Sequence, residues 1–182
     1  MNLDLTGQIA LVTGASRGIG QAIADELVKC GARVIGTATS ADGARAIDER
    51  LKASGGRGML LNVTEPNACE NIIDVIVKDF GGIQILVNNA GITRDNLAMR
   101  MKGEEWSDVI DTNLSSVFRL SQAVLEGLGF PSNTAWKIPL PPAPKKSKIN
   151  SSIENSIWIW TFVLPWIWRR ARGKSSGDGR VC

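Results

Sequence analysis

Three glycines in the spacing G-x-x-x-G-x-G constrain the fold of this chain more than any other feature of its sequence. They lie in the segment 13–20, after a short apolar run at 8–13 and before an amphipathic segment at 19–30. An apolar run that ends at glycine is typical of a buried parallel strand. Apolar residues spaced four apart, such as Ile23 and Leu27, are typical of a helix. The glycines therefore join a strand to a helix at the start of the chain.

The alternation of strand-like and helix-like segments continues to residue 125. Further strands are predicted at 33–37, 58–63 and 83–88, and further helices at 42–53, 67–80 and 103–125. Short connections between alternating strands and helices imply right-handed crossovers and a parallel sheet covered on both faces. We therefore expect an α/β fold, the N-terminal half of a Rossmann-like doubly wound sheet with strand order 3-2-1-4. The fourth strand is then an edge, and residues 156–164 are apolar and β-prone enough to pair with it.

The composition changes at residue 126. Residues 1–125 hold 12 Lys+Arg against 15 Asp+Glu, whereas residues 126–182 hold 9 against 3. The second part also has six of the seven prolines and five of the six tryptophans, with no sustained hydrophobic period. We expect an incomplete Rossmann-like domain over 1–125 and an unrelated, poorly ordered, Pro/Trp-rich basic tail over 126–182. A frame-shifted or misjoined coding sequence explains so abrupt a change within one predicted helix.

Two other interpretations of the tail stay open. The apolar run at 157–168 has 12 residues, short of the roughly 20 that span a bilayer. Its tryptophans and the basic segment at 169–172 suit a membrane interface. The segment P-L-P-P-A-P at 139–144 is compatible with a PxxP ligand. Either feature would make the chain an adaptor or a peripheral membrane protein.

Several classes of function are excluded or disfavoured by composition. The chain has no His and no Tyr, so no mechanism can use an imidazole or a phenol. A net charge of +3 does not indicate a nucleic-acid partner. Cys30, Cys69 and Cys182 lack metal-ligand spacing and are interpreted as free, buried thiols in a reducing cytosol, with no metal. The N-terminus shows no signal peptide, so we expect a cytoplasmic protein and no membrane partner.

The glycine loop has the composition of a phosphate-binding turn. Glycine permits a tight turn, lets the backbone approach a pyrophosphate and lets the helix pack close to the strand. The N-terminus of the following helix offers free N–H groups and the positive end of its dipole. The position between the first strand and the first helix favours dinucleotide binding over a structural turn that binds nothing.

The end of the second predicted strand indicates which nicotinamide nucleotide would bind. An acidic residue there would bind the ribose hydroxyls of NAD. The segment 36–40 has no carboxylate, and the next one is Asp42. Arg17 can bind a 2′-phosphate, with Thr39 or Ser40 as hydroxyl donors. The sequence therefore predicts NADP, and the alternative for Arg17 is a solvated surface charge.

Three motifs resemble the short-chain dehydrogenase/reductase family. They are T-G-A-S-R-G-I-G at 13–20, L-N-V at 61–63 and N-N-A-G-I-T-R-D-N at 88–96. The longer run L-V-N-N-A-G-I-T-R-D-N-L-A-M-R-M-K, followed by E-E-W and T-N-L-S-S-V-F-R-L-S, is similar to the subfamily of bacterial 3-oxoacyl-acyl-carrier-protein reductases. The resemblance covers about residues 5–125. It implies NADPH-dependent reduction of a 3-oxoacyl chain carried on acyl carrier protein, in fatty acid synthesis.

The resemblance also implies site residues. It assigns residues 14–20 to the pyrophosphate and 2′-phosphate, residue 39 to the adenosine phosphate side, residues 62 and 63 to the adenine, and residues 89–91 to the cofactor beyond the fourth strand. The implied cofactor-binding residues are Gly14, Ala15, Ser16, Arg17, Gly18, Ile19, Gly20, Thr39, Asn62, Val63, Asn89, Ala90 and Gly91. Asn113 matches the family's active-site asparagine, whose backbone carbonyl orders a water in a proton relay. From the residues alone, Asn88 and Asn89 could instead form a strand-ending turn.

The remaining catalytic residues of the family have no counterpart here. In the family a serine orients the carbonyl, a tyrosine gives the proton and a lysine four residues on lowers the pKa of the tyrosine. These should follow residue 125, and the chain contains neither the serine motif nor any tyrosine. We therefore expect the chain to be inactive alone, or to act as a non-catalytic NADP-binding or subunit-pairing module. The family's oligomer, which uses the long helix, is not expected because the partner helix is absent.

Overall fold

Strands and helices alternate along the chain in a computed structural model that describes residues 3–128 and 158–161. Five strands and five α-helices are present in this part of the chain, with a 3₁₀ turn, η1, and a π-helical turn, η2. Their bounds are β1 Ile9–Val12, α1 Gly18–Lys29, β2 Arg33–Ala38, α2 Ala41–Leu51, η1 Lys52–Ser54, β3 Arg57–Leu60, α3 Ala68–Phe80, β4 Ile85–Asn88, α4 Gly103–Ile110, η2 Asp111–Ser115, α5 Ser116–Gly127 and β5 Trp158–Thr161.

The strands form one parallel sheet in the order β3-β2-β1-β4-β5. The first four strands have the expected order 3-2-1-4, which confirms a Rossmann-like α/β fold. At the edge, Thr161 of β5 pairs with Asn88 of β4. The expected pairing of residues 156–164 with the fourth strand is thus found over β5. The rest of the tail, which was expected to be poorly ordered, lies outside the described residues.

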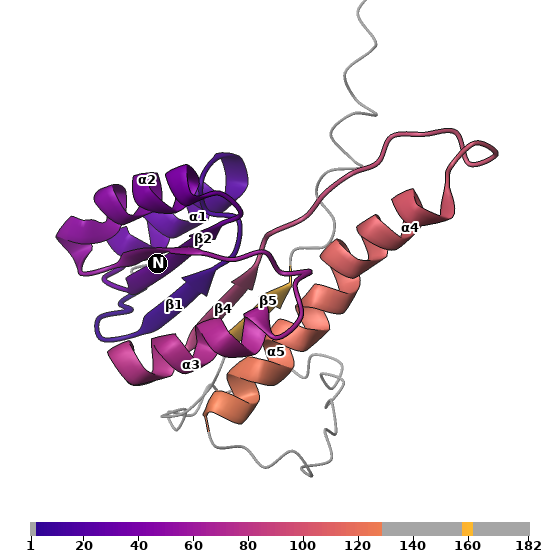
Figure 1. Cartoon of the computed structure of the whole chain (residues 1–182). Helices are drawn as coiled ribbons and strands as arrows, with labels where there is room; N and C mark the ends of the chain where they lie inside the picture. Colours follow the sequence, from indigo (N-terminus) through magenta and orange to yellow (C-terminus); the bar gives the residue numbers. More distant parts are fainter. Residues whose placement is uncertain (1–2, 129–157, 162–182) are drawn as a thin grey trace, which may run out of the picture.

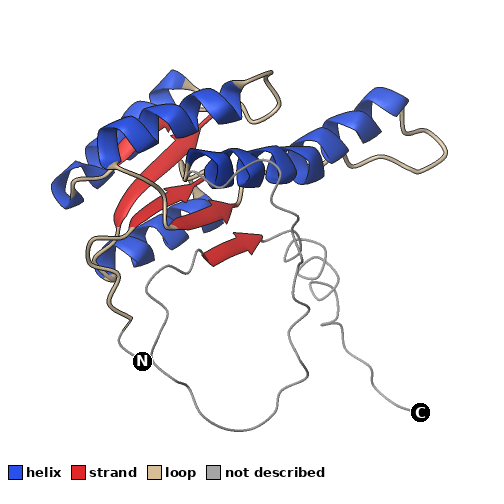
Figure 2. Cartoon of the chain, turned by 90° about the horizontal axis from the view of Figure 1, so that it is seen from below, coloured by secondary structure: helices blue, strands red, loops and turns tan. Residues whose placement is uncertain are grey.

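Two hydrophobic cores lie on opposite faces of the sheet, one under α1 and α2 and the other under α3 and α5, the helices that Figure 1 shows on either side of the strands. Alternate residues of β1 point to opposite faces, so Ala10 and Val12 pack with α1 and α2, whereas Leu11 packs with α3 and α5. Figure 2 shows helices on both sides of the strands. The core facing α1 and α2 is rich in alanine, including Ala15 and Ala24, which are fully buried. These small side chains let α1 and the glycine loop lie close to the sheet.

The long predicted helix at 103–125 is interrupted in the structure. It consists of α4, the π-helical turn η2 and α5, which ends at Gly127. At the junction of η2 and α5, the Ser116 hydroxyl donates a hydrogen bond to the Thr112 carbonyl oxygen at 2.6 Å. Such hydrogen bonds to the carbonyl four residues back often bend helices.

None of the described helices is long and apolar enough to cross a membrane.

The third strand is shorter than predicted. It ends at Leu60, whereas the sequence indicated a strand to Val63. Asn62 ends it, because its side-chain oxygen accepts hydrogen bonds from the N–H (3.2 Å) and hydroxyl (2.8 Å) of Thr64. An asparagine that binds the backbone two residues on forms a turn, which competes with the strand.

Gly36 in β2 is expected to tolerate no side chain. A Cβ at this position would lie 2.7 Å from Ile47 Cγ2 and 3.0 Å from Ala15 Cβ. Gly36→Ala should therefore lower the free energy of unfolding by about 1–3 kcal/mol through overpacking, measured by urea denaturation.

Gly103→Ala is the matched control, because no atom lies within 4 Å of a Cβ at the first residue of α4. It should leave stability unchanged or raise it by up to about 1 kcal/mol. Equal destabilisation by the two substitutions would contradict this account of the packing.

Candidate functional site

The glycine loop between β1 and α1 adopts a conformation that only glycine accommodates at low cost. Gly14 and Gly18 have φ values of 65° and 61°. A Cβ at Gly14 would lie 3.2 Å from Ala90 Cα, and one at Gly20 would collide with the Gly14 carbonyl oxygen and the Asn89 amide. The glycines thus serve the turn and the close contact between α1 and the end of β4.

Thr13 and Asn89 fasten this loop to the end of β4. The Thr13 hydroxyl oxygen accepts hydrogen bonds from the N–H groups of Asn89 and Ala90, both at 2.9 Å, and its hydroxyl donates to the Val87 carbonyl oxygen at 3.3 Å. The Asn89 amide nitrogen donates to the carbonyl oxygens of Thr13 (2.9 Å) and Gly14 (3.1 Å). The Asn89 side chain therefore binds the glycine loop to the end of β4, a role beyond that of ending the strand in a turn. Sequence reasoning missed the role of Thr13, for which the signal in the sequence was a threonine between an apolar run and the first glycine.

Residues 16–19 of the loop are exposed at the start of α1. No side chain caps this helix, because its N-cap residue Arg17 makes no capping hydrogen bond. The N–H groups of the first turn are thus available to a ligand at the positive end of the helix dipole. The Arg17 side chain is exposed and has no ion pair among the described residues.

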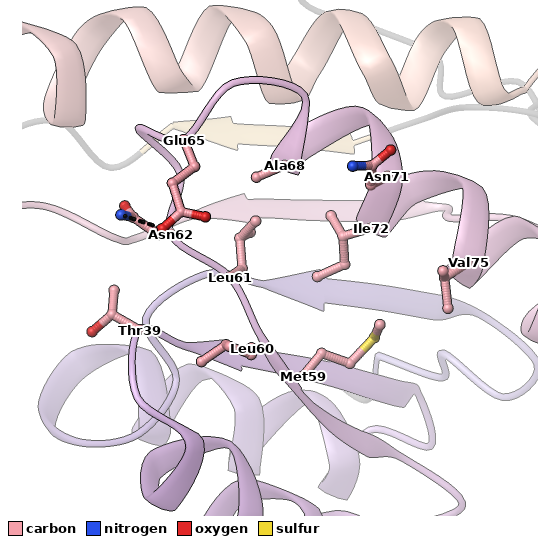
Figure 3. A pocket seen from close by; sticks show the side chains of 10 residues that line it. All are labelled: Thr39, Met59, Leu60, Leu61, Asn62, Glu65, Ala68, Asn71, Ile72 and Val75. Atoms are coloured by element: carbon pink, nitrogen blue, oxygen red, sulfur yellow. Dashed lines mark hydrogen bonds between the residues drawn. The ribbon is translucent and has the colours of Figure 1, made fainter.

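A cavity of about 320 Å³ lies at the carboxyl ends of β2 and β3, beside α3 (Figure 3). Thr39 and Asn62 both line it, so the structure brings these two predicted residues together. Figure 3 shows Asn62 beside Glu65, to which its amide nitrogen donates at 3.1 Å. Val63 does not line the cavity, because its side chain is 5% exposed and packs in the hydrophobic core.

The N-terminus of α2 lies next to the glycine loop. Ser40 caps this helix, its hydroxyl oxygen accepting from the Gly43 N–H at 3.1 Å. A Cβ at Gly43 would lie 3.6 Å from Ser16 Cβ, so α2 and the loop are in contact distance. The carboxylate of Asp42 pairs with Arg45 on the same helix. The Ser40 hydroxyl accepts the bond from Gly43, so its own proton can still be donated. Asp42, the first carboxylate after β2, is already paired with a cation.

Asn113 is held against the segment that follows β4. It lies in η2, where its side-chain oxygen accepts from the Ile92 N–H and its amide nitrogen donates to the Ile92 carbonyl oxygen, both at 2.9 Å. A Cβ at Gly91 would lie 3.1 Å from the same side-chain oxygen. Since both polar atoms of the amide are occupied in this way, the side chain holds η2 against the segment after β4. π-Helical turns occur often at functional sites.

No group of metal-ligating side chains is present in the described part of the chain. Cys30 and Cys69 are free thiols, as expected, although only Cys69 is buried. Burial raises the pKa of the Cys69 thiol, so it stays protonated and unreactive. Cys182 lies outside the described residues.

Comparisons with known proteins agree with this geometry. The family model described as short chain dehydrogenase matches residues 8–133, which extends past the composition change at residue 126. Over 126 residues the chain is 61% identical to the 3-oxoacyl-[acyl-carrier-protein] reductase of Escherichia coli K12 and 62% identical to that of Vibrio cholerae, in each case covering 69% of this chain and 51% of the relative. It thus spans about half the length of these curated relatives.

A solved structure gives the same result for the fold. A protein of Sinorhizobium meliloti assigned as a short-chain alcohol dehydrogenase matches with a TM-score of 0.64 and 35% identity, covering 69% of this chain and 51% of that one. The matched residues include the glycine loop, the four strands in the order 3-2-1-4 and the segment that contains Asn113. The chain belongs to the short-chain dehydrogenase family.

Proposed function

We propose that residues 1–125 are the NADP-binding domain of a 3-oxoacyl-acyl-carrier-protein reductase. The observation that carries this proposal is the glycine loop, whose residues 16–19 are exposed at the uncapped N-terminus of α1 and whose Gly18, at a φ of 61°, has no atom within 4 Å of where a Cβ would lie. Backbone that approaches a ligand closely at a helix N-terminus suits a diphosphate. When bound, the nicotinamide nucleotide supplies the hydride for reduction of a ketone.

The residues at the carboxyl ends of the strands would fit such a nucleotide. The loop residues 14–20 would hold the diphosphate, and Ala90 and Gly91 would line the part beyond β4. Thr39 and Asn62 line one cavity at the ends of β2 and β3, which suits the adenosine. Val63 would contribute through its position beside Asn62, since its side chain lies in the core.

NADP is preferred over NAD because of charge. A 2′-phosphate needs a cation, and Arg17 is exposed beside the loop without an acidic partner among the described residues. The ribose hydroxyls of NAD need a carboxylate at the end of β2, where the sequence has Thr39 and Ser40. Asp42, the first carboxylate, is paired with Arg45.

The substrate proposal rests on the relatives, which are named as 3-oxoacyl-[acyl-carrier-protein] reductases at about 60% identity. We infer a 3-oxoacyl thioester on acyl carrier protein as the substrate and the cytoplasm as the location. The free thiols of Cys30 and Cys69 support a reducing compartment.

Reduction of a ketone also needs a proton for the developing alkoxide. In this chain Asn113 would order a water through its backbone, but there is no tyrosine or histidine to donate the proton. We therefore propose that the chain binds NADP and does not turn over substrate alone. The second candidate function is accordingly a non-catalytic nucleotide-binding or subunit-pairing module.

The first test concerns nucleotide choice. The full chain should bind NADPH more tightly than NADH, and Arg17→Ala should weaken NADPH about tenfold, because a hydrogen bond to a charged group is lost. NADH affinity should stay unchanged in this variant. Both affinities are measured by quenching of tryptophan fluorescence.

Arg57→Ala is the control for loss of a positive charge, since Arg57 pairs with Asp79 at the start of β3, away from the loop. It should change neither affinity. An equal loss of NADPH and NADH affinity in Arg17→Ala would contradict the assignment of Arg17 to the 2′-phosphate.

The second test concerns turnover. Purified chain, made in a preparation free of host reductase, should consume NADPH with acetoacetyl thioester no faster than buffer does. Positioned proton transfer contributes about 10²–10⁴-fold to such a reaction, and the chain has no phenol to provide it. Turnover that persists and disappears in Asn113→Ala would show that the tail completes an active site.

A further inference from the structure

Side chains bind three successive carbonyl groups of the glycine loop. Asn89 binds the carbonyl oxygens of Thr13 and Gly14. The third, that of Ala15, accepts a hydrogen bond at 3.0 Å from Arg50, which lies 35 residues away near the end of α2. The family motif contains Asn89 but does not include Arg50.

Arg50 bridges three parts of the fold. Its Nη2 atom binds the Ala15 carbonyl oxygen, while its Nε atom lies 3.3 Å from the carboxylate of Asp25 on α1. The Nε atom is buried and makes no hydrogen bond, so the contact with Asp25 is an ion pair. The Arg50 side chain is only 25% exposed. Because the guanidinium group is planar and rigid, the ion pair on one side orients the donor on the other.

The orientation of one peptide group follows from this contact. The Ala15 carbonyl and the Ser16 N–H belong to the same planar trans peptide and point in opposite directions. Ala15 is fully buried, and its own N–H donates to the Thr37 carbonyl oxygen at 2.8 Å. With the Ala15 carbonyl directed toward Arg50, the Ser16 N–H points away from Arg50. No group among the described residues accepts a hydrogen bond from that N–H, and Ser16 is exposed.

We propose that Arg50, ion-paired with Asp25, is a positioning residue that directs the Ser16 N–H toward the diphosphate of a bound nicotinamide dinucleotide. This inference rests on the proposed function. Arg50 donates to the protein carbonyl, so its influence on the nucleotide passes through the peptide group. The diphosphate is common to NADPH and NADH, and the two nucleotides should therefore depend on Arg50 equally. In this respect Arg50 differs from Arg17, which is assigned to the 2′-phosphate of NADPH alone.

The experiment compares Arg50→Met and Asp25→Asn with the wild-type full chain. Arg50→Met should weaken NADPH and NADH by the same factor, about tenfold for one misdirected hydrogen bond to a charged group. It should also shift the ¹⁵N–¹H signal of Ser16 and change its amide exchange rate in the protein without nucleotide. Asp25→Asn should move both readouts in the same direction by less, because the hydrogen bond to Ala15 remains.

Arg57→Met is the matched control. It breaks the ion pair between Arg57, at the start of β3, and Asp79. The side chains of these two residues are 47% and 38% exposed, respectively. It should lower stability without changing the Ser16 signal or either affinity. Circular dichroism shows whether each variant is folded. If Arg50→Met does not fold, Arg50→Lys replaces it, since a lysine ammonium keeps the charge but cannot act as a planar fork.

The outcomes separate this inference from the proposed function. If the wild type binds neither nucleotide, the proposed function fails and the inference fails with it. If the wild type binds both and the Arg50 variant binds them as tightly, only the inference is overturned. An unchanged Ser16 signal also overturns it. Loss of NADPH affinity alone would show that Arg50 acts on the 2′-phosphate directly, which contradicts a positioning role.

Discussion

The hydrogen bonds between Thr13 and the start of the segment after β4 are the contact on which the rest of the site depends. Thr13 is buried, so its hydroxyl and the N–H groups of Asn89 and Ala90 must be paired with one another. This pairing fixes the glycine loop on one side, and the same segment holds the π-helical turn on the other through the two hydrogen bonds between Ile92 and Asn113. Loss of the Thr13 hydrogen bonds would therefore displace the glycine loop and the π-helical turn together.

The position of the site follows from the order of the strands. In open parallel sheets, ligands bind outside the carboxyl ends of the strands where successive connections leave toward opposite faces. Here that point lies between β1, which leads to α1, and β4, which leads to α4 and α5. β2 and α2 also pack closely against the glycine loop, because Gly36 in β2 and Gly43 in α2 leave room for Ala15 and Ser16. The cavity lined by Thr39 and Asn62 continues the same edge toward β3.

The sequence predicted the features that repeat along the chain and missed those that depend on single distant contacts. Strand order could be predicted because alternation with short connections permits few topologies. The π-helical turn could not, since one inserted residue barely changes the hydrophobic period of a helix, and its partner Ile92 is distant in sequence. The role of Arg50 was hidden for the same reason, because its side chain binds Ala15 across a separation of 35 residues. The assignment of the NADP-contacting residues remains a prediction.

The proposed nucleotide binding and the reduction of a substrate would depend on different groups of the protein. Within the described residues, the contacts that shape the glycine loop join β1, α1 and α2 with the segment after β4. At the carboxyl end of β4, the side-chain nitrogen of Asn88 is buried and has no hydrogen-bond partner among the described residues. An unpaired buried amide costs about 1–3 kcal/mol, so a hydrogen-bond partner for Asn88 would stabilise this part of the fold. The chain spans about half the length of its relatives and contains no tyrosine or histidine, so neither a phenol nor an imidazole of this chain can donate the proton. Affinity for the nucleotide therefore tests the proposed role of the glycine loop directly, whereas turnover depends in addition on a proton donor.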